Sequence, residues 1–276
     1  MSSHVLSVDL GTTGVKVCVV SPDGRVVAGA SETLPLLMTA DGGVEQDPHL
    51  WWQAIGRCAR HVVSTSDVDA RDVGTIAVTS QFMSVVPVDA VGRPLANCIM
   101  WMDERGRHHW SPDRSIAAAT HWLEVHGLVP FGNDSVGQMH TALQIDPSLT
   151  TRATAFVQPM DAIVARLTGN VTATQHTAFP LFAVDNRMPD ALEYSADLLE
   201  RTGIPPSLLP TLVPRGHARG AITRDAADHL GVTTDAIVAD ACIDTVATAF
   251  GTGAVTTARC GVSLGTTTVV ATHTSH

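Results

Sequence analysis

The first 33 residues limit the fold most, because short apolar runs alternate with turn signals and leave no room for a helix. The apolar runs predict strands at 5–9, 15–21 and 25–32. The sequence Pro-Asp-Gly at 22–24, between the last two strands, is typical of a β-turn. The start of the chain is therefore expected to fold as a three-stranded antiparallel meander.

A helix is expected directly after this meander. Asp47 and Pro48 have the residue types of a helix N-cap and first helical position, and apolar residues at helical spacing continue the helix over 48–64. Short apolar runs then predict strands at 75–79 and 85–89. This mixture of strands and helices predicts an α/β layered domain.

The remaining chain gives weaker signals. Helical patterns that stop at a glycine predict helices at 159–167, 189–201 and 224–230. The C-terminal part predicts a strand at 236–241, a helix at 244–250 and a hairpin at 261–272, whereas residues 128–150 match no pattern.

Charge and hydropathy exclude several classes of protein. The formal net charge is -10 and the basic residues are scattered, which argues against nucleic-acid binding. No apolar run is long enough to cross a membrane, and the N-terminus does not have the pattern of a signal peptide. We therefore expect a cytoplasmic protein.

Cysteine and histidine spacing gives no support for a metal centre. The five cysteines stand singly without a Cys-x-x-Cys pair, which argues against a disulfide framework or a zinc knuckle. The densest group of histidines is His108, His109, His121 and His126. Their spacing does not match a metal motif, so they are expected at the surface.

One short motif occurs twice. Asp9-Leu10-Gly11-Thr12-Thr13 near the start and Ser263-Leu264-Gly265-Thr266-Thr267 near the end each place Gly-Thr-Thr after a strand. Such a turn can wrap a phosphate, because glycine lets the backbone approach and threonine donates hydrogen bonds. The alternative is an ordinary β-turn with threonines chosen for strand propensity.

Two charged side chains near the first turn extend this hypothesis. Asp9 is a carboxylate that could hold a hydrated magnesium ion facing the phosphates, since small hard cations prefer oxygen ligands and keep waters. Lys16 supplies a positive charge nearby.

The segment 9–16 resembles the first phosphate motif of the actin-like ATPase superfamily. Further segments resemble the FGGY carbohydrate kinases, particularly the xylulokinase-like members: 44–48 with Trp51-Trp52, 78–81, 99–105, 166–169 and 237–244. The resemblance covers nearly the whole chain. It implies a ribonuclease H-like (actin-like ATPase) fold, a mixed sheet with flanking helices, and the use of ATP and Mg²⁺.

The resemblance also implies a division of the chain. Residues 1–236 correspond to the N-terminal actin-like domain, and 237–276 to the start of an incomplete C-terminal domain. Family members continue into a second domain with the adenosine pocket, so we expect strands beginning at Ile237 and Val262 to lack sheet partners. The expected partners, besides a small-molecule sugar or polyol, are a second copy in a homodimer or a complementing C-terminal half.

Asp244 matches the carboxylate that acts as general base toward the substrate hydroxyl in this family. A carboxylate suits this role, because phosphoryl transfer depends mainly on positioning and charge neutralisation. The alternative is that Asp244 only caps the helix that follows it. The two roles are compatible.

The resemblance places the sugar against two loops. The first contains Gln81, Phe82 and Met83, and the second contains Trp101 and Asp103. An aromatic face suits a carbohydrate, and amide or carboxylate groups can bind its hydroxyls.

The sequence departs from xylulokinases at two positions near the expected sugar. These enzymes tend to have Gln-Met-His-Gly where this chain has Gln-Phe-Met-Ser at 81–84, and Asn where it has Thr245. The implied function is ATP-dependent phosphorylation of a ketose such as xylulose or of a polyol, with the exact sugar open. The alternative is a catalytically silent sugar-binding or interaction protein.

Overall fold

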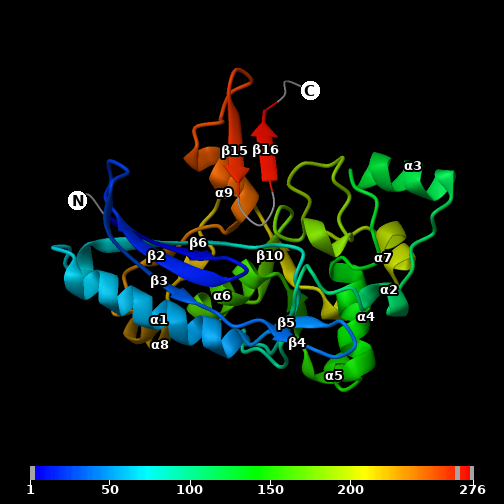
Figure 1. Ribbon diagram of the computed structural model, residues 1–276, viewed down its shortest axis with the longest axis horizontal. Coiled ribbons are helices and arrows are strands. Elements are labelled where there is room, and N and C mark those ends of the chain that lie inside the picture. The colour runs from blue at the N-terminus through cyan, green and yellow to red at the C-terminus, as the bar shows by residue number, and fades with distance from the viewer. Residues whose placement is uncertain (1–3, 265–267, 274–276) are drawn as a thin grey trace.

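The computed structural model describes residues 4–264 and 268–273, which are built around one mixed sheet (Figure 1). Within this part, the sheet has seven strands in the order β12-β13-β6-β1-β2-β3, and β14 also pairs with β6. The strands are β1 His4–Leu10, β2 Gly14–Val20, β3 Val26–Thr33, β6 Val73–Ser80, β12 Gly220–Ala221, β13 Ile237–Val238 and β14 Cys242–Ile243. β1, β2 and β3 run antiparallel, whereas β6 lies parallel to β1 and to both β13 and β14.

The N-terminal meander and the helix after it are confirmed. Alternate residues of β1 and β2 are buried, and this apolar face contributes to the main core together with Trp51 and Ile55 of α1, Pro48–Thr65. Asp47 is the N-cap of α1, and its carboxylate accepts the backbone N–H of His49 at 2.8 Å. The expected range 48–64 thus differs from α1 by one residue.

Two more predicted helices pack around this core. α6 spans Pro159–Thr168 and α8 spans Arg224–Leu230. Each ends at a glycine in the left-handed region, Gly169 with φ 76° and Gly231 with φ 76°. Glycine adopts this conformation without the steric cost of a side chain, which explains why both helices stop where the sequence predicts.

The middle of the chain forms a second apolar core that includes Trp122, Phe156 and Phe182. The helices of this part are α2 Gly106–His109, α3 Ile116–Val125, α4 Ser135–Ile145, α5 Leu149–Arg152 and α7 Ala196–Thr202, with the 3-10 turns η2 Phe179–Leu181 and η3 Pro206–Leu208. A further 3-10 turn, η1 Ala70–Asp72, precedes β6. Short strands form three small sheets: β4 Leu37–Met38, β5 Val44–Gln46 and β8 Cys98–Ile99; β7 Val86–Val88 and β9 Ala155–Val157; β10 Thr172–Thr174 and β11 Thr211–Val213. α4 lies in the segment for which the sequence predicted no element.

Two expectations for the middle of the chain are wrong. The helix expected over 189–201 begins only at Ala196, because Ser195 has extended backbone angles and its hydroxyl caps the helix. His126 is buried instead of exposed: its ring stacks on Phe179 and Phe182, and its Nε2 lies 2.9 Å from the Phe179 carbonyl oxygen. Burial lowers the pKa of His126, which favours the neutral ring.

Of the strand expected over 236–241, only β13 at 237–238 forms, and β14 follows at 242–243, beyond the expected range. Both strands pair with β6. The expectation that the strand at Ile237 would lack a sheet partner is therefore wrong. The division of the chain at residue 236 stays a prediction.

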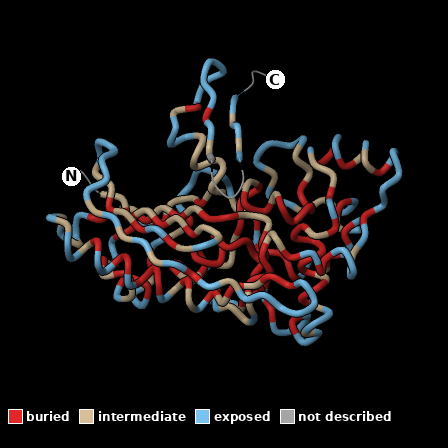
Figure 2. Tube along the Cα trace, viewed as in Figure 1, coloured by how far each residue is buried: buried red, intermediate tan, exposed pale blue. Residues whose placement is uncertain are grey.

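The C-terminal part consists of α9 Asp244–Gly251 and the hairpin of β15 Cys260–Leu264 and β16 Thr268–Thr272. These elements stand out from the sheet in Figure 1, and Figure 2 shows them largely exposed or half-buried. Within the described residues β15 pairs only with β16, and Val262 and Val270 are exposed. The hairpin and α9 are as the sequence predicted.

None of the helices described in residues 4–264 is both long and apolar enough to cross a membrane.

Candidate active site

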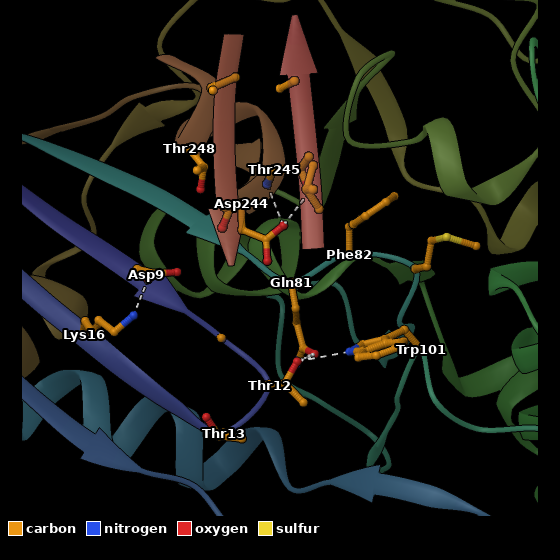
Figure 3. Close-up of a pocket in the computed structure, with 17 residues that line it drawn as sticks. Asp9, Thr12, Thr13, Lys16, Gln81, Phe82, Trp101, Asp244, Thr245 and Thr248 are labelled. Carbon is orange, nitrogen blue, oxygen red and sulfur yellow. Dashed lines mark hydrogen bonds and ion pairs between the residues drawn. The ribbon is translucent and has the colours of Figure 1, made fainter. Parts of the chain in front are cut away.

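A cavity of about 410 Å³ lies where the β1–β2 turn, the loop after β6 and α9 meet (Figure 3). Ten residues expected from the sequence line it: Asp9, Gly11, Thr12, Thr13, Lys16, Gln81, Phe82, Met83, Trp101 and Asp244. Additional lining residues that the sequence did not indicate include Thr248, Val269 and Ala271. The fold therefore brings together side chains from distant parts of the chain.

One end of the cavity is formed by the turn between β1 and β2. The turn is closed by a hydrogen bond from the Gly11 N–H to the Gly14 carbonyl at 2.9 Å. Asp9 and Lys16 are paired across the two strands, and Lys16 Nζ lies 3.4 Å from Asp9 Oδ2. Both side chains remain accessible, so the cation and the carboxylate can each turn to a ligand.

Thr12 connects this turn to the expected sugar loops. Its hydroxyl donates to Gln81 Oε1 at 3.1 Å and accepts from Trp101 Nε1 at 3.0 Å (Figure 3). Gln46 Nε2 donates to the Thr12 carbonyl at 2.7 Å. The Thr12 hydroxyl proton is thus used inside the protein, and the residue orients Gln81 and Trp101 as well as shaping the turn.

Gln138 of α4 holds together the two loops that the sequence predicted to bind sugar. Its Nε2 donates to the carbonyls of Met83 at 2.7 Å and Met100 at 3.2 Å. Met83 has a positive φ of 59°, a conformation that non-glycine residues adopt only when their surroundings hold it. Gln138 was not predicted from the sequence, because Gln138 lies in the segment that matched no pattern and its partners are backbone atoms of other loops.

Asp103 does not line the cavity. Its side chain is completely buried and accepts hydrogen bonds from the Val44 N–H at 2.8 Å and from Arg105 Nη2 at 2.6 Å. Arg105 also binds Glu45 at 2.6 Å. The carboxylate is thus engaged in fixing the loop after Trp101, so this geometry does not support the expected contact of Asp103 with sugar.

Asp244 lies at the first position of α9, directly after β14. Its Oδ1 accepts the backbone N–H of Thr245 at 2.6 Å and the Thr245 hydroxyl at 3.1 Å. The N-cap residue itself is Ile243, so Asp244 is not the N-cap, although it does satisfy one N–H of the first turn. Burial raises the pKa of Asp244, and the nearby Asp9 carboxylate raises it further.

The donor set around Asp9 suits a hydrated cation and not a protein cage. No group of three or more His, Cys, Asp or Glu residues that could hold a metal ion occurs in residues 4–264 and 268–273. A single accessible carboxylate can hold Mg²⁺ when waters and ligand phosphates complete the octahedron. Asp9 fits this arrangement.

The second Gly-Thr-Thr turn, Gly265, Thr266 and Thr267, lies outside the described residues. The strands that flank it contribute Ser263 and Val269 to the cavity. The role expected for the turn stays a prediction.

The sheet order, the turn after β1 and the carboxylate that opens α9 together define a protein with the actin-like ATPase fold. The chain belongs to the FGGY family of carbohydrate kinases: residues 4–251 match the N-terminal domain of that family. This confirms the family resemblance and the fold class inferred from the sequence.

Similar proteins include the xylulose kinase of Bacillus subtilis, 26% identical over 97% of this chain and 53% of its own length. The xylulose kinase of Streptomyces coelicolor is 29% identical, over 90% of this chain and 50% of its own. The crystal structure of gluconate kinase from Lactobacillus acidophilus superposes with a TM-score of 0.84 at 20% identity, covering 98% of this chain and 54% of the kinase. The chain thus spans about half the length of these relatives.

Proposed function

We propose that the cavity is the place where a hydroxyl of a ketose or polyol receives the terminal phosphate of ATP, with Asp244 as the general base. The observation that carries this proposal is the position of Asp244, which lines the same cavity as the turn after β1 and the side chains Gln81 and Trp101. A phosphate at the turn and a sugar on Trp101 would therefore have a proton acceptor beside them.

The environment of Asp244 suits proton transfer. Burial raises its pKa, so the carboxylate is a stronger base than an exposed aspartate. The hydrogen bonds from Thr245 hold the carboxylate in one orientation, which reduces the entropy that positioning costs. In this mechanism Asp244 accepts the proton of the attacking hydroxyl.

Groups at the end of the cavity formed by the β1–β2 turn would neutralise the negative charge of the phosphates. Lys16 and the backbone around Gly11 lie where phosphate oxygens would approach the turn. Asp9 would hold Mg²⁺, which supplies charge neutralisation on the phosphates. The second Gly-Thr-Thr turn would contribute further N–H and hydroxyl donors.

The sugar end combines an apolar surface with few polar groups. Trp101, Phe82 and Met83 would pack against the carbon chain, and Gln81 would bind a hydroxyl. This suits a small ketose or polyol, in agreement with relatives named xylulose kinase and glycerol kinase.

Because the chain spans about half the length of its relatives, we propose that residues 237–276 begin a second domain that supplies the adenosine pocket. This domain would belong to the same polypeptide or to a complementing chain. The expected place of action is the cytoplasm, where ATP is available.

The test has two parts. A polypeptide in which this chain is joined to the second half of a related kinase is assayed with ATP, Mg²⁺ and a panel of pentuloses, hexuloses and polyols, and the 276-residue chain is titrated with the same panel by calorimetry. We expect phosphorylation of at least one compound by the joined polypeptide and binding of that compound by the chain. Binding without phosphorylation would support the silent sugar-binding alternative, and no binding at millimolar concentration would refute the proposed sugar site.

A further inference from the structure

A second group of charged side chains lies outside the cavity and surrounds Arg219. The Arg219 side chain is only 1% exposed and lies 3.1 Å from Asp161 and 3.4 Å from Asp240. Arg219 also donates to the carbonyl of Thr172 at 2.5 Å and to its hydroxyl at 2.8 Å. None of these residues lines the cavity around Asp244.

Stability alone does not explain this cluster. Asp161 is 1% exposed, its Oδ2 has no partner within the described part of the chain, and burial raises its pKa to about 6. A buried ion pair of this kind is often no more stabilising than apolar residues of the same size. The cluster also fixes the backbone that leads to Asp244.

The cluster lies beside an irregularity in the strands that lead to Asp244. Along β6, Val238 of β13 is opposite Ile76, and Cys242 of β14 is opposite Thr79. The segment from Val238 to Cys242 advances by four residues while its partner β6 advances by three. One extra residue is therefore accommodated between β13 and β14. An extra residue of this type redirects the side chains that follow it, because strand residues alternate between the two faces of a sheet.

Asp240 lies in this irregular segment and is held from two sides. Its Oδ2 accepts the backbone N–H of Gly216 at 2.9 Å, and its Oδ1 lies 3.4 Å from Arg219 Nη1. The backbone N–H of Arg219 in turn donates to the Val238 carbonyl at 2.8 Å. Asp240 therefore ties the irregular segment to the chain that leads into β12.

The segment is also held on the side nearer to Asp244. Thr79 Oγ1 donates to the Cys242 carbonyl at 2.9 Å, and the Ile243 N–H donates to His176 Nε2 at 3.4 Å. Burial lowers the pKa of His176 and so favours the neutral ring, whose Nε2 can accept this bond. The backbone is thus fixed from Asp240 to the residue before Asp244.

We propose that Asp240, held by Arg219 and Gly216, is a positioning residue that fixes the extra residue between β13 and β14 and thereby the direction in which Asp244 faces. The kinetic part of this inference rests on the proposed function. The structural part does not, because it concerns only how rigidly the backbone of residues 239–244 is held.

The test compares Asp240→Asn with the control Asp190→Asn in the polypeptide that joins this chain to the second half of a related kinase. Asp190 forms a more exposed ion pair with Arg215, which directly precedes Gly216. Asp190→Asn therefore removes a carboxylate charge near the segment and leaves the hydrogen bonds of Asp240 to Gly216 and Arg219 in place. Hydrogen exchange, followed by mass spectrometry on peptides covering 239–249, reports the order of the backbone. We expect faster exchange in these peptides for Asp240→Asn and no change for Asp190→Asn.

Steady-state kinetics provide the second measurement. Misplacement of a catalytic group by about 1 Å can lower a rate by about 100-fold. We therefore expect kcat to fall about 10- to 100-fold in Asp240→Asn with the KM for sugar nearly unchanged. A general loss of folding would instead lower the active fraction or change both constants.

Each outcome is decisive. Unchanged exchange in Asp240→Asn, or faster exchange with unchanged kcat, would overturn the inference. Faster exchange in a protein whose wild type phosphorylates no sugar would leave the structural part standing and refute the proposed function. If Asp240→Asn does not fold, Arg219→Lys replaces it, because lysine keeps the buried charge and loses the planar fork that spans Asp161 and Asp240.

Discussion

Two Asp-x-Arg turns share one local geometry and differ mainly in burial. In each, the arginine N–H donates to the aspartate Oδ1 at 2.9 Å and Nε donates to it at 3.1 Å, for 69–71 and for 103–105. The side chains of Arg71 and Asp69 are 78% and 47% exposed. Those of Arg105 and Asp103 are 7% and 0% exposed. The pair at 69–71 is therefore a matched control for the buried pair.

Replacement of Arg105 by methionine should be strongly destabilising. Arg105→Met leaves the buried Asp103 carboxylate with only backbone N–H donors among the described residues, such as that of Val44. It also removes the ion-pair partner of Glu45. Removal of one partner of a buried ion pair costs about 3–5 kcal/mol. Arg71→Met should leave the free energy of unfolding unchanged within error, because solvent screens an exposed pair and replaces its hydrogen bonds.

The assay is urea unfolding of both variants and the wild type, followed by tryptophan fluorescence. The double variant Arg105→Met with Asp103→Asn should recover part of the loss, because it removes the uncompensated charge. Equal effects of Arg105→Met and Arg71→Met would refute the reasoning. If Asp103→Asn weakened sugar binding without a loss of stability, the assignment of Asp103 to stability alone would be wrong.

Three further predictions concern the site and the fold. Burial raises the pKa of Asp244 above its ordinary value of 3.8, so as the pH falls Asp244 should lose its basic form at a higher pH than an exposed aspartate does. The fall of kcat/KM on the acid side should therefore begin at this higher pH, and Asp244→Asn should abolish that fall. Asp9→Asn should lower activity in a way that added magnesium partly restores, whereas Asp244→Asn should show no such rescue in the same titration; equal rescue of both would show that the roles are misassigned. Gly137→Ala should cost about 1–3 kcal/mol in unfolding experiments, because a Cβ there would lie 1.8 Å from the Gly132 carbonyl oxygen, whereas Gly251→Ala meets nothing within 4 Å and should fold normally.

Local signals in the sequence were sufficient to predict the helices and strands that form the first core. The meander, α1, α6 and α8 each have a periodic apolar face and a recognisable turn, cap or terminal glycine within the element itself. α4 has no comparable signal, because residues on most of its circumference are buried by other parts of the chain. Its position is decided by packing between distant segments.

The site residues also fall into those that local motifs predicted and those that depend on distant contacts. Motifs in the sequence indicated ten residues that line the cavity, because each lies beside a strand end or turn that the motif defines. Asp103 belongs to such a motif, yet its carboxylate is used by Arg105 and Val44, and a contact 59 residues away in the chain leaves no local pattern. The irregular segment at Asp240 was missed for the same reason, since the extra residue is visible only relative to β6.

The proposed phosphorylation requires that Asp244 acts in proton transfer and not only in sugar binding or in stabilising the start of α9. Asp244→Asn keeps the size of the side chain and an oxygen that can accept the Thr245 N–H, so the fold and the sugar site should remain. The decisive measurement is the rate of sugar phosphorylation by this variant, joined to a second half as above, beside its calorimetric affinity for the same sugar. We predict a loss of at least about 100-fold in kcat with nearly unchanged affinity, because the lost interaction belongs to the transition state. Full activity of Asp244→Asn would contradict the assignment and leave Asp244 as a residue that only stabilises the start of α9.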